Sequence, residues 1–116
     1  FSIPGIRGIE FGDGFAAAGM KGSRHNDPII DICGHTAKNG CGGINGGISN
    51  GNEIVFRVAV KPTSSISKTQ ETFNFATGRM TTLSAGGRHD TCFALRTAPV
   101  VEALAACVLA DFIARC

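Results

Sequence analysis

The chain lacks tryptophan and tyrosine, and its basic residues are scattered rather than clustered, with only 17% of positions charged. Nucleic-acid-binding surfaces usually combine a basic stripe with aromatic side chains, so we expect no nucleic-acid partner. No apolar run reaches the roughly 18 uninterrupted residues of a membrane span. No charged segment precedes an apolar one at the N-terminus. We therefore expect a protein with no membrane partner and no export signal, and the cytoplasm is its default location.

The chain also lacks a disulfide framework and a metal-binding pattern. Its five cysteines are odd in number and irregularly spaced, and Cys107 lies in an apolar stretch, which favours reduced thiols. Cys33 and His35, with Cys41 and His25, are zinc-type donors, but their spacing matches no closed four-ligand site. No nucleophile stands on a strained turn with a histidine and an acid in a recognisable order. We predict no metal, and hydrolysis is disfavoured.

Glycine, in contrast, is abundant. Sixteen glycines in 116 residues are about twice the usual frequency of roughly 7%, so loops hold much of the backbone. The stretch from Ile3 to Phe11 and the alternating stretch Glu53 to Val60 are typical of strands. Asn50-Gly51 predicts a hairpin turn that pairs the second stretch with Ile44 to Ser49. Gln70 to Phe75 and Arg79 to Leu83 predict a further hairpin.

The C-terminal segment predicts a helix from Val100 to Cys116, with Pro99 in the first turn and Thr97 as the cap. This helix is apolar nearly all round, so we expect it to be buried between layers. The predicted fold class is α+β, with antiparallel hairpin strands and a long buried C-terminal helix. Both ends are abrupt, and we expect residues 1–116 to be a single partial domain cut from a longer protein.

A glycine motif near the N-terminus matches a dinucleotide-binding fingerprint. Gly12-Asp13-Gly14-Phe15-Ala16-Ala17 follows a predicted strand, and Asp31 stands about 20 residues on, where a ribose-binding acid belongs. However, Gly19 and Gly22 interrupt the helix that should follow, which makes it too short to cross a sheet. A glycine-rich strand-to-turn connection is the commoner interpretation.

Three loops carry groups that suit an anionic ligand. Lys61-Pro62-Thr63-Ser64-Ser65 supplies a cation and three hydroxyls after a strand, although an ordinary solvated loop often has this composition. Gly42 to Ser49 holds two glycine pairs that permit close approach of the backbone to a ligand or to another layer. Gly86-Gly87-Arg88-His89-Asp90 adds a guanidinium, an imidazole and a carboxylate, for which the alternative is a solvated loop with an internal ion pair.

Together these motifs resemble, in order and spacing, those of the chorismate synthase family. The resemblance covers nearly the whole chain but only about the last third of the family's polypeptide. It rests on the following stretches: Ile3 to Phe15, Gly42 to Gly51, Val58 to Ile66, Gly87 to Asp90 and Ala98 to Ala103. Family members carry their catalytic histidines and most substrate-binding arginines in the N-terminal portion, which has no counterpart here.

The resemblance implies a lyase of the shikimate pathway, used in aromatic amino-acid biosynthesis. It converts 5-enolpyruvylshikimate 3-phosphate to chorismate with reduced FMN, and it folds as a β-α-β sandwich that assembles as a homotetramer. At the matching positions it implies that Gly46 packs against FMN and that Arg88 lies where the flavin and the substrate phosphate meet. Asp90 is implied as the catalytic carboxylate near the flavin N5. The implied flavin-holding residues are Lys61, Pro62, Thr63, Ser64 and Ser65.

The chain departs from the family at a few positions. Gly40 and Cys41 stand where the family usually has Asn or His followed by Ala or Ser, which puts the geometry beside the glycine loop in doubt. Thr91 replaces the commonest residue, proline, and leaves Arg88 and Asp90 in place.

The alternative function is a non-catalytic fragment or remnant with only a structural or assembly role.

Overall fold

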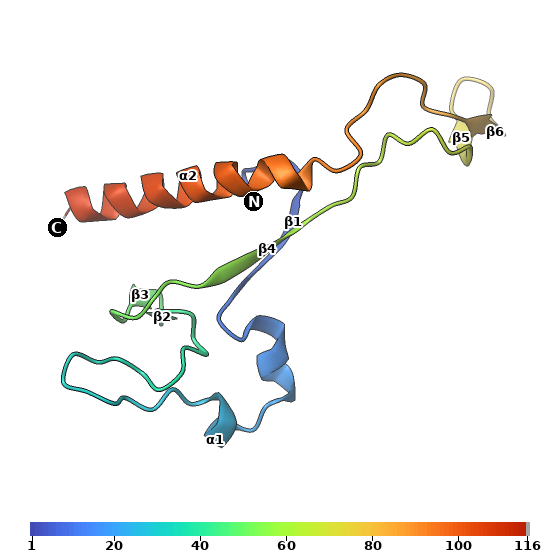
Figure 1. The fold of residues 1–116 in the computed structure, drawn as a ribbon. Helices are drawn as coiled ribbons and strands as arrows, with labels where there is room; N and C mark the ends of the chain where they lie inside the picture. The colour runs from blue at the N-terminus through green and yellow to red at the C-terminus, as the bar shows by residue number, and fades with distance from the viewer. Residues whose placement is uncertain (116) are drawn as a thin grey trace. The chain divides into compact units, whose positions relative to one another are not determined.

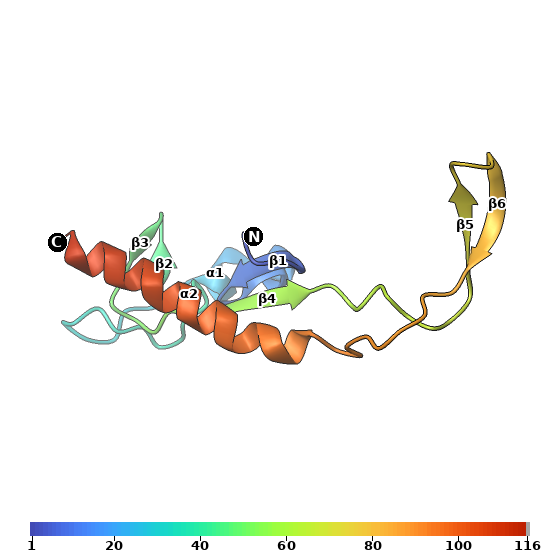
Figure 2. The same ribbon diagram turned by 90° about the horizontal axis from the view of Figure 1, so that it is seen from above.

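The computed structural model describes residues 1–115 of the 116-residue chain. The chain divides into two units, one from Phe1 to Val60 and one from Lys61 onward, and each is described by itself. Figures 1 and 2 show the helices and strands along the chain. Paired antiparallel strands and a long helix make this an α+β structure, as predicted. In order along the chain the elements are β1 (Ile6–Phe11), η1 (Gly14–Gly19), α1 (Gly22–His25), β2 (Ile44–Asn45), β3 (Ile48–Ser49), β4 (Phe56–Val60), β5 (Gln70–Asn74), β6 (Arg79–Leu83) and α2 (Ala94–Ala114).

Strands β1 and β4 pair antiparallel, with a bulge near the start of β1. Alternation of apolar residues favours both strands, and Phe11 lies opposite Phe56 with ring centroids 5.7 Å apart. Glu10 lies opposite Arg57, whose Nε donates to the Glu10 carboxylate at 2.8 Å. Ile6, on β1, is the buried large hydrophobic residue in the described part of the chain.

The strand pairing predicted across Asn50-Gly51 is wrong. Residues 44–49 form a hairpin of their own, in which β2 pairs with β3, and β4 pairs with β1 instead. The hairpin turn consists of Gly46 and Gly47, whose φ angles are +57° and +83°. Two consecutive positive φ angles are what a tight two-residue hairpin needs, and glycine adopts them without steric strain.

Strands β5 and β6 form the second predicted hairpin, which is confirmed. The Asn74 Oδ1 accepts the backbone N–H groups of Ala76 and Thr77, and Gly78 takes a φ of +66°, so the turn is fixed by local residues. Two extended legs flank this hairpin, residues 61–69 before it and residues 84–93 after it (Figure 2). The Ser84 hydroxyl donates to the Ser67 carbonyl at 2.8 Å, which joins the legs near the hairpin.

Helix α2 begins at Ala94 rather than at Val100, so Thr97 is not its cap. The Thr97 hydroxyl instead donates to the Phe93 carbonyl at 3.2 Å from inside the helix. Pro99 is interior and lacks the N–H that would bond to the carbonyl four residues earlier. The helix continues to Ala114, and the predicted end at Cys116 lies outside the described residues.

The predicted burial of α2 is not confirmed. Its large apolar side chains are exposed, including Leu104, Val108 and Phe112, and Thr97 is the buried residue of the helix. By length and composition alone, α2 is also long and apolar enough to cross a membrane. A core helix of a soluble protein meets the same criterion, so the criterion does not assign α2 to a membrane.

Candidate functional site

In the N-terminal unit, three segments of backbone cross at glycines. The N–H of Gly12 donates to the Val55 carbonyl at 3.0 Å, and the N–H of Val55 donates to the Gly42 carbonyl at 3.1 Å. A Cβ on Gly12 would lie 2.1 Å from the Gly40 oxygen, and one on Gly42 would lie 2.4 Å from the Gly12 nitrogen. These glycines are therefore needed for close packing of backbone on backbone.

Two short helices decide between the two interpretations of the Gly12 motif, a dinucleotide-binding fingerprint and a glycine-rich connection. The residues after it form the 3-10 helix η1 of six residues and the helix α1 of four. Neither can cross back over a sheet in the way that a dinucleotide-binding unit requires. The structure favours the glycine-rich connection.

Asp27 and Lys38 anchor the segment that contains Gly40 and Cys41, the two positions where the chain departs from the resembled family. The Asp27 carboxylate accepts the N–H of Gly40 at 2.9 Å and that of Cys41 at 2.8 Å. The Lys38 Nζ lies 3.3 Å from the same carboxylate. Burial acts to raise the pKa of Asp27, but these hydrogen bonds outweigh it and lower the pKa to about 2.

The Gly46–Gly47 turn, unlike Gly12 and Gly42, is not closely packed. A Cβ added to Gly46 or to Gly47 would meet nothing within 4 Å. Both residues are exposed, so their backbone is open to a flat ligand.

In the C-terminal unit, two of the predicted anion-binding loops lie together. The Thr63 hydroxyl donates to the Thr91 carbonyl at 3.4 Å, which joins the Lys61–Ser65 loop to the loop that contains Arg88 and Asp90. The side chains of Lys61, Ser64, Ser65 and Arg88 make no hydrogen bond or ion pair with any residue between 1 and 115. The paired loops therefore present free cationic and hydroxyl donors.

Asp90 and His89 are held within the same region. The Asp90 carboxylate lies 3.1 Å from an Arg96 guanidinium nitrogen at the start of α2. The His89 Nε2 lies 3.1 Å from the Gly86 carbonyl, as expected for a hydrogen-bonded loop histidine. Arg96 is not among the predicted site residues, because the sequence predicts a helix start at Val100 and only the structure places Arg96 in the first turn of α2.

The predicted site residues thus fall into two groups. Those from Lys61 to Ser65 and from Arg88 to Asp90 are brought together, whereas Gly46 belongs to the other unit. Among residues 1–115, no three histidine, cysteine, aspartate or glutamate side chains lie close enough to hold a metal ion. Guanidinium, ammonium and hydroxyl donors are the groups that bind phosphate. The protein is therefore of the α+β class, and its paired loops carry unpaired donors of the kinds that bind phosphate.

Comparison with known proteins shows the family to which the chain belongs. The family model described as chorismate synthase matches residues 1–114, so the chain belongs to the chorismate synthase family. The chorismate synthase of Chitinophaga pinensis is 62% identical over 112 residues, which are 97% of this chain and 34% of that protein. The chorismate synthase of Archaeoglobus fulgidus is 51% identical over 111 residues, which are 94% of this chain and 31% of that protein.

A solved structure supports the same assignment. The structure titled "Crystal Structure of Chorismate Synthase" matches with a TM-score of 0.51 and 45% sequence identity, over 55% of this chain and 20% of that one. The resemblance deduced from the motifs is confirmed. The chain spans about a third of the length of the curated relatives it matches.

Proposed function

We propose that this chain forms part of an enzyme that eliminates phosphate from 5-enolpyruvylshikimate 3-phosphate to give chorismate, with reduced FMN as cofactor. Membership of the chorismate synthase family supports the reaction. The structural observation that carries the proposal is the hydrogen bond from Thr63 to Thr91, which joins the loop of Lys61, Ser64 and Ser65 to the loop of Arg88. Ammonium, hydroxyl and guanidinium donors of this kind suit a phosphate. When bound, reduced FMN lends electron density to the substrate as phosphate leaves, in a reaction that is redox-neutral overall.

The donors of the paired loops fit a phosphorylated flavin. Lys61 supplies a mobile positive charge, Pro62 limits the motion of the loop backbone, and Thr63, Ser64 and Ser65 supply hydroxyls. Thr63 is committed to Thr91, so we assign the direct contacts with phosphate oxygens to Lys61 and to the two serine hydroxyls. Gly46 offers the flavin ring an open stretch of backbone, because a Cβ there would meet nothing.

Arg88 and Asp90 have different roles in this proposal. Arg88 has a guanidinium with no partner within residues 1–115 and is suited to bidentate binding of the substrate phosphate and the flavin. Asp90 is the catalytic carboxylate that holds or moves a proton beside the flavin N5. Its carboxylate forms an exposed ion pair with Arg96, at 3.1 Å.

The wider properties follow from the family resemblance. The complete enzyme is proposed to be a cytoplasmic homotetramer with no nucleic-acid or membrane partner. Residues 1–116 are proposed to contribute one partial domain, so the isolated chain is expected to be inactive or nearly so.

A hybrid enzyme tests the proposal. In it, residues 1–116 replace the matching segment of the Chitinophaga pinensis relative, and the hybrid is given reduced FMN and 5-enolpyruvylshikimate 3-phosphate without oxygen. We expect chorismate to form, and we expect Lys61→Gln and Arg88→Gln to weaken FMN binding by about tenfold each, because each removes a charge-assisted hydrogen bond. Lys68→Gln is the matched control, because Lys68 is exposed and lies outside the Lys61–Ser65 loop.

The alternative is that this chain is a remnant with only an assembly role. A hybrid that folds and binds FMN but makes no chorismate would favour that alternative. A hybrid whose FMN affinity is equally insensitive to all three substitutions would refute the assignment of the flavin-holding loop.

A further inference from the structure

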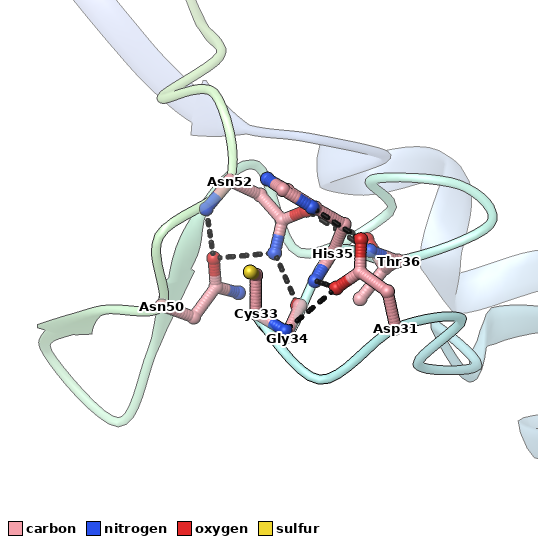
Figure 3. Close-up of polar contacts among 7 residues, drawn as sticks. All are labelled: Asp31, Cys33, Gly34, His35, Thr36, Asn50 and Asn52. Atoms are coloured by element: carbon pink, nitrogen blue, oxygen red, sulfur yellow. Dashed lines mark hydrogen bonds and ion pairs between the residues drawn. The ribbon is translucent and has the colours of Figure 1, made fainter.

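Asparagine side chains connect the loop of residues 28–37 to the β2–β3 hairpin in the N-terminal unit. Figure 3 shows Asn52 in the middle of this network, between Thr36 and Asn50. Its Oδ1 accepts the N–H of Thr36 at 3.0 Å and the Thr36 hydroxyl at 3.3 Å, and its Nδ2 donates to the Gly34 carbonyl at 3.2 Å. Asn52 is therefore fixed to the loop by three hydrogen bonds.

That loop is itself rigidly closed. The Asp31 carboxylate accepts the N–H groups of Cys33 and His35 at 2.9 and 3.0 Å and also pairs with the His35 ring (Figure 3). The N–H of Ala37 donates to the Pro28 carbonyl at 2.9 Å, which closes the base of the loop. Asn52 thus has a well-ordered anchor.

Asn50 continues the chain of contacts toward the hairpin. Its Oδ1 accepts both the backbone N–H and the Nδ2 of Asn52, each at 3.0 Å. Its own Nδ2 donates to the Asn45 Oδ1 at 2.5 Å. Asn45 directly precedes Gly46, so this series of hydrogen bonds ends next to the turn.

Apart from this bond, the hairpin is held by the pairing of β2 with β3 and by the Asn50 N–H, which donates to the Gly43 carbonyl at 2.9 Å. Strands β2 and β3 have two residues each, and a Cβ at either turn glycine would meet nothing within 4 Å. A two-stranded hairpin of this length is marginally stable in water. Two glycines in the turn add conformational freedom that must be lost when a ligand binds.

We propose that Asn50, held by Asn52, positions the Gly46–Gly47 turn for FMN through its hydrogen bond to Asn45. Asn45, Asn50 and Asn52 are positioning residues that act through the turn. This inference rests on the proposed function, in which Gly46 contacts FMN. The glycines permit close approach, and the asparagines orient the turn before the ligand arrives, which lowers the entropy cost of binding.

Aspartate substitutions in the hybrid enzyme test the Asn45–Asn50 bond. In Asn45→Asp or Asn50→Asp alone, one side-chain amide still faces one carboxylate and can donate to it. In the double variant two carboxylates face each other, so the bond is lost and replaced by repulsion. In each single variant we expect the dissociation constant for FMN to change by less than about threefold. In the double variant we expect it to rise about tenfold beyond the product of the two single changes.

The controls separate positioning from folding and from charge. Asn26→Asp adds the same charge at an exposed asparagine that makes no side-chain hydrogen bond within the described residues, and it should leave FMN binding unchanged. The visible circular dichroism of bound FMN should change in the double variant, because the ring is held differently. The thermal midpoint of the apoprotein should be the same in all variants.

Each outcome is decisive. If the unsubstituted hybrid binds FMN and the double variant shows only the product of the single effects, the positioning role is overturned and the proposed function stands. If the unsubstituted hybrid does not bind FMN, the proposed function fails and this inference fails with it. Should the double variant not fold, Asn45→Ala decides, because it removes the acceptor without adding charge. Unchanged FMN binding in that variant overturns the positioning role, and weakening by about fivefold supports it.

Discussion

Replacing Asp27 with asparagine removes the charge that anchors the glycine segment at residues 39–43. The Asp27 side chain is only 9% exposed, and it accepts the N–H groups of Gly40 and Cys41. Asparagine has nearly the same shape, but it lacks the charge and one of the two acceptor oxygens. The segment should therefore open more often in the variant.

The magnitude follows from the pKa of Asp27, which falls from 3.8 to about 2 in the folded protein. Burial of the carboxyl opposes this change, and the hydrogen bonds from Cys41, Gly40 and Lys38 outweigh it. The difference corresponds to about 2 kcal/mol of stability. Because the folded-state pKa is lowered, this stability is present above roughly pH 4, the unfolded value, and is lost as the pH falls through the folded value near 2.

Hydrogen exchange followed by mass spectrometry measures this opening locally, in the hybrid enzyme. At pH 7 we expect the amides of Gly40 and Cys41 to exchange about 30-fold faster in Asp27→Asn, the rate ratio that about 2 kcal/mol gives. The corresponding free-energy difference should fall to about half near pH 3. Peptides covering residues 70–83 should be unaffected, and Asp111→Asn, which breaks an exposed ion pair with Arg115, should have little effect anywhere.

Two results would refute this reasoning. Equal exchange rates at pH 7 would show that the Asp27 charge does not hold the segment. A rate ratio that stays constant as the pH is lowered would show that asparagine acts through its shape and not through the lost charge.

The remaining predictions concern the glycines, the proton-handling residue and the isolated chain. Gly42→Ala should destabilise the N-terminal unit by about 2 kcal/mol or more, because its φ is +66° and its Cβ would meet backbone; unchanged exchange protection there would contradict this. Gly46→Ala should weaken FMN binding more than Gly47→Ala, although both positions are equally open, and equal affinities would argue against a flavin contact at Gly46. Arg96→Gln should lower kcat with little change in FMN affinity or stability, because the ion pair with Asp90 is exposed; an unaltered kcat would mean that Arg96 does not act on Asp90. The isolated 116-residue chain should self-associate, because apolar side chains of α2 and of the β5–β6 hairpin are exposed; a monodisperse monomer with a cooperative melt in sedimentation and calorimetry would contradict that.

The elements that the sequence predicted correctly depend on neighbouring residues. The β5–β6 hairpin forms because two short strands flank a turn fixed by Asn74 and Gly78. The helix near the C-terminus was predicted from its apolar repeat, but its start was not. Pro99 is typical of a first helical turn, yet here it lies inside the helix, where only one backbone hydrogen bond is lost.

The incorrect pairing of residues 44–49 has a different cause. The Asn50-Gly51 step is a good local turn signal, but the partner of β4 is β1, about 50 positions earlier in the chain. Which strand pairs with β4 depends on how the side chains of the two strands pack together, and not on the turn sequence alone. Asn52 is not predicted as a site residue for a similar reason, since its partners Thr36 and Gly34 lie 16 and 18 residues earlier in the chain.

The sequence by itself determined the family and the order of its motifs, because these depend on residue type and spacing. Only the tertiary structure decided that the Lys61–Ser65 loop lies against the loop of Arg88 and Asp90, through Thr63 and Thr91. It alone showed that Asp27 anchors the Gly40 segment and that Asn50 and Asn52 reach the Gly46 turn. Hydrogen bonds between distant loops depend on the path of the whole chain, and no local propensity specifies that path.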